Sequence, residues 1–343
     1  MPCILLTGAT GYIASHMWVI ARSAGYQVVG VDSHVNSSPR VLDRLRTLIG
    51  EEPVFVQGDV RDAAVLDRCF AVGRERFGGV DAVVHFAALK AVGESVERPL
   101  DYFENNLGGL LSVCQAMKRQ GVQQLVFSSS ATVYGQPERL PITEDAPLRS
   151  TNPYGQTKLV GEDLLRGLEA CDPNWQIAYL RYFNPVGAHP SGLIGEDPRG
   201  IPNNLMPYVA QVAVGKRPHL NVFGNDYDTP DGTGVRDYIH VMDLAEGHVA
   251  ALKYLADQKQ SLTVNLGTGR GYSVLELARA YGEAADREVP VVFAPRRPGD
   301  VAACYADPAM AERLMGWKAS RGLKEMCVDS WRWQSTNPQG FEG

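Results

Sequence analysis

The chain has 343 residues, of which 45% are hydrophobic and 21% are charged. These proportions are typical of a globular protein large enough for two lobes, and they exclude the disordered and fibrous classes. The net charge is -6 and no long run of Lys or Arg is present. Nucleic-acid binding is therefore not expected, because affinity for a phosphate backbone depends on a clustered basic face.

The cysteines and histidines are scattered along the chain. No C-x-x-C pair occurs among the six cysteines, which are Cys3, Cys69, Cys114, Cys171, Cys304 and Cys327. This spacing indicates neither a disulfide framework nor a metal site. No signal-peptide pattern precedes the first strand-like run, and no stretch reaches the ~18 apolar residues of a membrane span. We therefore expect a cytoplasmic protein with no membrane partner and no bound metal.

Short β-rich runs alternate with helical segments over the first half of the chain. The runs are residues 4–7, 27–31, 53–57, 82–87, 124–129 and 177–182. Continuous apolar strands separated by helices are typical of a parallel sheet that is buried on both faces. Residues 1–185 are therefore predicted to form a doubly wound parallel (Rossmann) α/β domain.

Glycine and proline become denser after residue 185, which indicates a second, smaller α/β lobe rich in loops over residues 186–343. A helical pattern at residues 244–255 is followed by a strand-like run at 262–266. Part of residues 241–270 is therefore expected to return to the first sheet, so that the domain boundary is not a single cut.

The first strand leads into the turn Gly8-Ala9-Thr10-Gly11-Tyr12-Ile13-Ala14. Gly8 would permit the tight turn, and Gly11 would let the backbone approach a pyrophosphate at the start of the next helix. Asp32 ends the second strand, where a carboxylate can accept hydrogen bonds from the adenosine ribose and repel a 2′-phosphate. The pattern predicts NAD rather than NADP. An ordinary βα turn followed by a surface aspartate is the alternative.

Tyr154 is followed four residues later by Lys158, just after Pro153. Positions i and i+4 of a helix share one face, roughly 5–6 Å apart at Cβ. A phenol of pKa ~10 is a poor base, but a nearby ammonium group and the positive nicotinamide ring both stabilise the phenolate. The pair is therefore predicted to act as a general acid/base, with Ser130 bonding the same substrate hydroxyl. A helix-surface pair and a serine-rich turn are the alternatives.

Together these features resemble the extended short-chain dehydrogenase/reductase family. Four longer strings are similar to those of its UDP-glucose 4-epimerases: HFAALKAVGES at 85–95, LRYFNPVGA at 180–188, IPNNLMP at 201–207 and GTGVRDYIH at 232–240. The similarity extends over nearly the whole chain. It implies NAD as cofactor, a UDP-hexose as substrate and the second lobe as the UDP-sugar-binding domain.

The resemblance also implies which residues bind each ligand. For NAD these are Gly8, Gly11, Tyr12, Ile13, Asp32, Asn36, Ser37, Asp59, Val60, Phe86, Ala87, Lys90, Asn105, Lys158 and Phe183. For the nucleotide sugar they are Ser130, Tyr154, Asn184, Asn204, Leu205, Phe223, Arg236, Arg297, Asp300 and Cys304. The two arginines suit a diphosphate, because guanidinium groups bind phosphate oxygens through charge-assisted bonds. One departure is Ala14, where these epimerases carry glycine, and NAD binding is expected to be retained.

The mechanism that the resemblance implies is a reversible oxidation at C4 of the hexose. Tyr154 removes the proton of the 4-hydroxyl while hydride passes to the nicotinamide, and the 4-keto sugar turns over before hydride returns to its other face. Cys304 is small where epimerases restricted to plain hexoses carry tyrosine, so UDP-N-acetylglucosamine and UDP-N-acetylgalactosamine are expected as further substrates. A homodimer through helices near residues 98–119 and 153–170 is also implied.

Two rival functions are weighed against the epimerase. Dehydratases of this fold need a pair of acidic residues where this chain has Ala131 and Thr132, and a related decarboxylase needs one at the second position, Thr132. A non-catalytic NAD-sensing module would have no need for Ser130, Tyr154 and Lys158 together.

Overall fold

The computed structural model describes residues 1–200, 202, 204–297 and 300–342. Ile201 and Asn203 of the IPNNLMP string lie outside the described residues.

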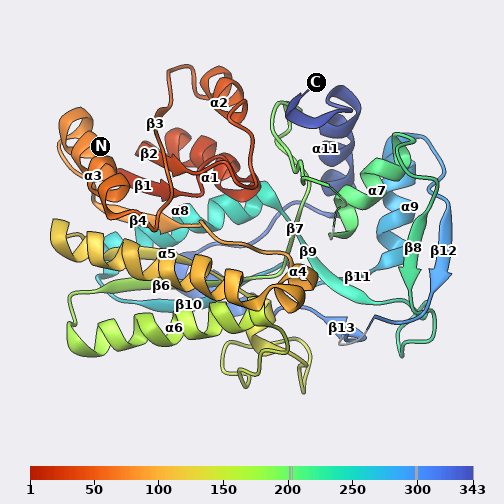
Figure 1. Ribbon diagram of the computed structural model, residues 1–343. Coiled ribbons are helices and arrows are strands. Elements are labelled where there is room, and N and C mark those ends of the chain that lie inside the picture. Colours follow the sequence, from red (N-terminus) through yellow and green to blue (C-terminus); the bar gives the residue numbers. More distant parts are fainter. Residues whose placement is uncertain (201, 203, 298–299, 343) are drawn as a thin grey trace.

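Seven parallel strands form the central sheet, in the order β10-β6-β5-β4-β1-β2-β3 (Figure 1). Their bounds are β1 (Cys3–Thr7), β2 (Gln27–Asp32), β3 (Val54–Gln57), β4 (Ala82–His85), β5 (Gln124–Ser130), β6 (Gln176–Tyr182) and β10 (Leu262–Leu266). The predicted doubly wound parallel sheet is confirmed. Strand β4 ends two residues before its predicted end, because the N–H groups of Phe86 and Ala87 donate to the Thr7 side-chain oxygen.

Helices cover both faces of this sheet (Figure 1). One face carries α1 (Tyr12–Ser23), α2 (Val41–Ile49), α8 (Val241–Gln258) and α10 (Ala309–Met315), and the other carries α3 (Ala63–Phe77), α5 (Pro99–Gln120) and α6 (Pro153–Cys171). The side chains of β1 alternate between the two cores, with Ile4 and Leu6 in the first and Cys3 and Leu5 in the second. This alternation is why the strand is apolar from Cys3 to Leu6.

The second lobe is smaller and mixed α/β, as predicted. Its strand β9 (Val235–His240) pairs with β7 (Asn184–Val186), β11 (Gly271–Ser273) and β13 (Ala303–Cys304), and β8 (Leu220–Phe223) pairs with β12 (Val291–Ala294). Its core lies between α7 (Leu205–Ala213), α9 (Val274–Ala285) and α11 (Leu323–Thr336). Three short helices complete the described chain: α4 (Val92–Glu97), η1 (Ala131–Tyr134) and η2 (Gly340–Glu342).

The strand order reverses between β1 and β4, because the chain runs outward through β2 and β3 before β4 pairs with the free side of β1. Ligands of doubly wound sheets bind at such a switch point, beyond the carboxyl ends of the strands. Within the described ranges, no helix combines the length and the apolar character needed to cross a bilayer.

Three buried histidines make the stability of this fold sensitive to acid. Burial lowers the pKa of His16 and His85 to about 3 and that of His248 to about 4. The Nδ1 atoms of His16 and His248 lie 2.7 and 2.8 Å from the carbonyl oxygens of Tyr12 and Leu244, so each donates a proton as a neutral ring.

We expect the free energy of unfolding to fall by about 3–4 kcal/mol between pH 6 and pH 5 from these three groups. The unfolded chain, with histidine pKa values near 6.5, binds up to three more protons than the native protein in this range, so acid favours unfolding. Urea titrations at both pH values measure the difference. His248→Gln should reduce it by about a third, and an unchanged pH dependence in this variant would contradict the assignment.

Candidate active site

The glycine turn after β1 approaches the end of β4 closely. Gly8 has φ +66°, and a Cβ atom at this position would lie 2.9 Å from the Ala87 nitrogen. The N–H of Gly11 donates to the Gly8 carbonyl at 2.9 Å, and Gly11 is the N-cap of α1 with no side-chain cap bond. The first amides of α1 therefore face the crevice together with the positive end of the helix dipole. A side chain at Gly8 would clash with the backbone of Phe86 and Ala87, and one at Gly11 would lie 3.0 Å from the Gly8 carbonyl oxygen.

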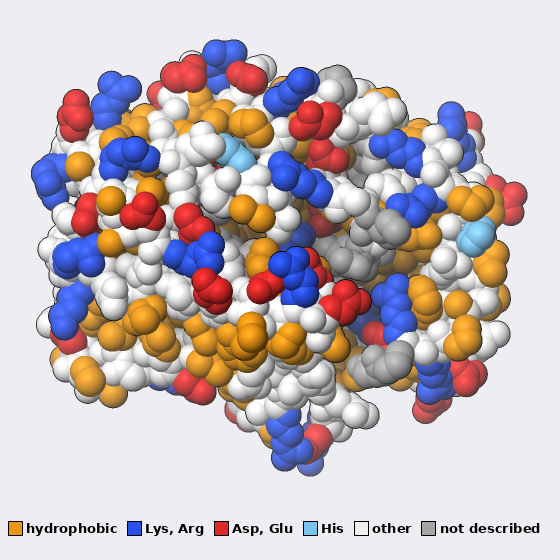
Figure 2. Space-filling view, viewed as in Figure 1, with side chains coloured by type: hydrophobic (Ala, Val, Ile, Leu, Met, Phe, Trp, Pro, Cys, Tyr) orange, Lys and Arg blue, Asp and Glu red, His pale blue; other side chains and the backbone are white. Residues whose placement is uncertain are grey.

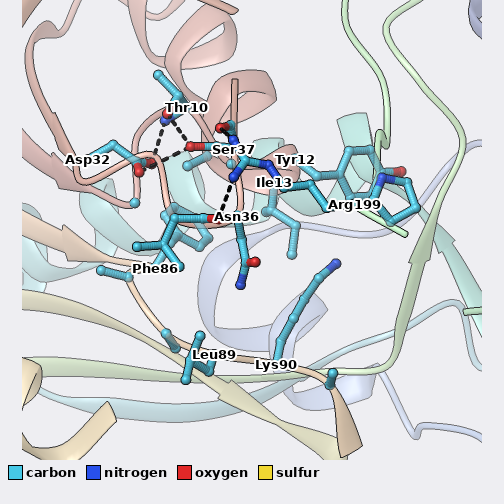
Figure 3. Close-up of a pocket in the computed structure, with 18 of the residues that line it drawn as sticks. Thr10, Tyr12, Ile13, Asp32, Asn36, Ser37, Phe86, Leu89, Lys90 and Arg199 are labelled. Atoms are coloured by element: carbon cyan, nitrogen blue, oxygen red, sulfur yellow. Dashed lines mark hydrogen bonds between the residues drawn. The ribbon is translucent and has the colours of Figure 1, made fainter. Parts of the chain in front are cut away.

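Asp32 is held at the carboxyl end of β2 by three hydrogen bonds. Its carboxylate accepts from the Thr10 N–H at 3.0 Å, the His34 N–H at 2.8 Å and the Ser37 hydroxyl at 3.1 Å. Figure 3 shows Thr10, Asp32 and Ser37 gathered at one end of the pocket. This network orients the carboxylate beside the glycine turn, where the ribose of a dinucleotide would lie.

A cavity of about 520 Å³ runs from Asp32 past the glycine turn to Tyr154 and Lys158. This volume is within the usual range of ligand pockets. Its lining includes all the residues predicted to bind NAD except Phe183: Gly8, Gly11, Tyr12, Ile13, Asp32, Asn36, Ser37, Asp59, Val60, Phe86, Ala87, Lys90, Asn105 and Lys158. Phe183 is instead buried in a small apolar cluster with Val133, Tyr134 and Ile142. The residues that line the cavity fit a dinucleotide. The glycine turn and the first amides of α1, here called the anion cradle, lie in the middle of the cavity, and the Asp32 carboxylate lies at one end.

Tyr154 and Lys158 stand at the other end of the cavity, on the first two turns of α6. Pro153 is the first residue of this helix, and the Asn152 side chain caps it by accepting from the Gly155 N–H at 2.8 Å. The Lys158 ammonium lies 5.9 Å from the centroid of the Tyr154 ring and donates to the Ser128 carbonyl at 2.7 Å. The strand β5 therefore holds the lysine in position beneath the tyrosine.

The protonation of this pair is set by burial. Burial lowers the pKa of Lys158 to about 7. Burial also raises the pKa of Tyr154 to about 12, although the Ser130 hydroxyl opposes the shift. The phenol is thus protonated at neutral pH in the protein alone, and it needs added positive charge in the site to act as a base.

Ser130 is the last residue of β5 and the N-cap of η1. Its oxygen accepts from the Thr132 N–H at 3.2 Å and from the Thr132 hydroxyl at 2.9 Å. The Ser130 hydroxyl lowers the pKa of Tyr154, against the larger effect of burial. A substrate hydroxyl between them could be bonded by both.

The residues predicted to bind the nucleotide sugar fall into three places. Tyr154 and Asn204 line the cavity, whereas Ser130 ends β5 and is not among the described residues that line it. The others belong to the second lobe and its junction: Asn184 begins β7, Leu205 begins α7, Phe223 ends β8, Arg236 is in β9, Cys304 is in β13, and Arg297 and Asp300 follow β12.

Two pairs of these second-lobe residues are in contact. Arg236 lies 3.5 Å from the Asp300 carboxylate and donates to the Val301 carbonyl at 2.9 Å. The Arg297 guanidinium lies 3.8 Å from the centroid of the Phe223 ring. Cys304 pairs in register with Arg236, and its side chain is partly buried. The Arg297 guanidinium is thus stacked against an aromatic face, whereas Arg236 is paired with a carboxylate.

Several residues that the sequence reasoning missed also line the cavity. Ser128 holds Lys158, and Tyr182, Glu196, Arg199 and Phe341 close the walls. Ser128 could have been found from the serine-rich strand in which it lies. Glu196, Arg199 and Phe341 carry no local pattern, because each reaches the cavity only through the tertiary fold.

Comparison with known proteins places this chain in a family. Residues 4–267 match the model of the NAD dependent epimerase/dehydratase family. The chain is 58% identical over 339 residues to a UDP-glucose 4-epimerase of Bacillus subtilis, covering 99% of this chain and 98% of the relative.

Solved structures agree. The chain resembles the UDP-glucose 4-epimerase of Bifidobacterium longum in complex with NAD+ and UDP, with a TM-score of 0.93 and 52% identity over 98% of this chain and 99% of that one. It also resembles the enzyme of Stenotrophomonas maltophila with bound NAD and formylated UDP-arabinopyranose, with a TM-score of 0.95 and 51% identity over 99% of each chain. The chain therefore belongs to the NAD dependent epimerase/dehydratase family and falls among its UDP-glucose 4-epimerases.

Proposed function

We propose that this protein is a UDP-hexose 4-epimerase that interconverts UDP-glucose and UDP-galactose through a 4-keto sugar, with NAD held tightly. The observation that carries the proposal is one cavity with an anion cradle and Asp32 at one end and the Tyr154 phenol above Lys158 at the other. The names of the relatives and the ligands of the solved structures support the same activity.

The chain's own residues supply orientation and proton transfer. Tyr154 takes the proton of the sugar 4-hydroxyl and returns it, and Ser130 bonds the same oxygen. Bound NAD supplies the hydride acceptor and donor, and its positive ring favours the phenolate. Lys158, with its pKa lowered to about 7 by burial, adds positive charge when it is protonated. Arg236 and Arg297 hold the diphosphate while the hexose turns over.

The proposed division of the chain follows the ligands. Residues 1–185, joined by part of 241–270, form the NAD-binding domain, and residues 186–343 form the UDP-sugar-binding domain. The position of β10 at the edge of the seven-stranded sheet and of α8 against α1 supports the return of the chain to the first domain.

The chain lacks the acidic residues that dehydration and decarboxylation require. Elimination of water calls for acidic residues at the positions of Ala131 and Thr132, and loss of carbon dioxide calls for one at Thr132, but these two residues instead form the first turn of η1. The Thr132 hydroxyl is used to donate to Ser130.

We also propose a homodimer and retain the prediction of a cytoplasmic location. Exposed apolar side chains gather over α4 and α5, namely Val92, Val96, Leu100 and Leu111. Figure 2 shows hydrophobic side chains across the part of the surface where α4, α5 and α6 lie. An exposed apolar band of this kind suits burial against a second copy. Sedimentation equilibrium tests the proposal.

The experiment that tests the function is an assay without added cofactor. The purified protein is first analysed for bound NAD and is then incubated with each of the four UDP-sugars, and the products are separated by chromatography and identified by NMR. We expect one bound NAD per chain and interconversion of UDP-galactose and UDP-glucose. Bound NAD with no sugar turnover would favour the sensing module, and a deoxy-keto sugar or a pentose would indicate a rival chemistry.

Substrate range depends on Cys304. A tyrosine at this position would occupy the space that a 2-acetamido group needs, so Cys304→Tyr should lower kcat/KM for UDP-N-acetylgalactosamine by about 10- to 200-fold. The loss for UDP-galactose should be less than about tenfold. Cys171→Tyr, at an exposed cysteine on α6, is the matched control. Equal losses for both sugars, or no turnover of the acetylated sugars by the unaltered protein, would refute the role of Cys304.

A further inference from the structure

The segment Gly195–Arg199, here called the strap, forms one wall of the cofactor cavity. It lies between β7 and α7 in the second lobe, and all five of its residues line the cavity. The glycine turn and Asp32 line the same cavity from the first lobe. The strap therefore stands across the space that a dinucleotide would occupy.

Arg199 joins the strap to the loop that follows β2. Its guanidinium donates to the Val35 carbonyl and to the Ser37 carbonyl, each at 2.9 Å. Figure 3 shows Arg199 reaching toward the segment that carries Asn36 and Ser37. This loop also holds Asp32 through the Ser37 hydroxyl. The fork of the guanidinium thus closes the adenosine end of the cavity with two charge-assisted bonds.

Glu196 joins the strap to the loop that follows β4. Its carboxylate accepts from the Lys90 ammonium at 3.0 Å and from the Asn204 amide at 3.1 Å, and its side chain is only 10% exposed. Lys90 also lies 5.9 Å from the centroid of the Tyr12 ring. The bond between Glu196 and Lys90 therefore lies on the β4 side of the switch point, whereas the bonds of Arg199 lie on the β2 side.

The outer side of the strap is held by the end of the chain. The indole N–H of Trp333 donates to the Glu196 carbonyl at 3.3 Å, and the Phe341 N–H donates to the Asp197 carboxylate at 2.9 Å. Gly195 packs so closely on Trp333 that a Cβ atom would lie 2.3 Å from the ring. The strap is thus packed against α11 and the end of the chain on its outer side. On its inner side, release of a ligand would have to break the bonds of Arg199 to the loop after β2 and the bond of Glu196 to Lys90.

We propose that Arg199 and Glu196 are cofactor-retention residues, which keep the strap closed over NAD between turnovers. The inference rests on the proposed function. An epimerase restores NAD in each cycle and has no need to exchange it, whereas an ordinary dehydrogenase must open its site every turnover. A tie made of charge-assisted bonds across the cavity slows dissociation without touching the reacting atoms.

The test compares the release of NAD from variants of the holoprotein. Arg199→Ala should release NAD about tenfold faster than the unaltered protein, because two bonds from a largely exposed arginine are lost. Glu196→Gln should release it about three- to tenfold faster, since the amide keeps an acceptor but loses the charge. Release is followed by removing free NAD with an NAD glycohydrolase and measuring the cofactor that stays bound by chromatography.

Arg74→Ala is the matched control, because Arg74 is also exposed and donates to a neighbouring oxygen, Gln120 Oε1 at 2.7 Å, but lies on α3 away from the cavity. Circular dichroism checks folding, and Arg199→Lys, which keeps the charge but loses the fork, replaces the alanine variant if that variant does not fold. Release from the Arg199 variant at the unaltered rate, or equally fast release from the Arg74 variant, would overturn the inference. Slow release without sugar turnover by the unaltered protein would instead overturn the proposed function.

Discussion

Replacing Tyr154 by phenylalanine is expected to lower kcat with UDP-galactose by about 10²- to 10⁴-fold. The substitution removes the only atom of this side chain that can take the proton of the sugar 4-hydroxyl, and it leaves the ring and its contact with Lys158 in place. The content of bound NAD should stay unchanged, because the cradle around Gly8 and Gly11 is untouched. Turnover is measured from the conversion of UDP-galactose to UDP-glucose at saturating substrate.

Tyr281→Phe is the matched control for this experiment. Tyr281 is a buried tyrosine of α9 whose hydroxyl lies 3.3 Å from the Ser330 hydroxyl, remote from the cavity lining. Its loss should leave kcat within about threefold of the unaltered value. If Tyr154→Phe kept more than a tenth of the normal turnover, Tyr154 would not be the base.

The second large effect is expected at the buried ion pair behind the active site. Glu162 and Arg181 are 0% and 2% exposed and are joined by two bonds, of 2.9 and 2.6 Å. Glu162→Ala should lower the free energy of unfolding by about 3–5 kcal/mol, because the guanidinium would remain buried without its counter-charge. The Ser129 hydroxyl, which donates to the same carboxylate at 2.6 Å, would lose its acceptor as well.

Urea denaturation measures this loss, with Glu312→Ala as the control. Glu312 makes an exposed pair with Lys318 at 3.5 Å, and removal of a surface pair should change stability by less than about 1 kcal/mol. Similar losses of unfolding free energy in the two variants would show that burial of the Glu162–Arg181 pair adds nothing to stability. Glu162 lies one turn after Lys158 on α6, and Ser129 is adjacent to Ser128, which binds Lys158, on β5. The Glu162→Ala variant should therefore also alter the position of Lys158. A shifted pH profile of kcat would report this change.

The strands and the catalytic spacing were accessible from the sequence because both depend on neighbours along the chain. A strand buried on both faces is apolar at nearly every position, as in β1 from Cys3 to Leu6. A tyrosine and a lysine four residues apart must share one face of a helix. The glycine turn was also accessible, since its conformation is decided by two residues without side chains. The exact end of β4 was not, because it depends on the Thr7 hydroxyl 79 residues earlier in the chain.

By itself, the sequence determined the class of the sheet, the cofactor turn and the acid/base pair, since local periodicity and short spacing are enough to specify these. Only the tertiary structure decided that Arg199 meets the carbonyl of Ser37, 162 residues away, and that Phe183 packs in an apolar cluster rather than in the cavity lining. The reason is that such contacts depend on the order of the strands and the docking of two lobes, and neither leaves a pattern in the residues that meet.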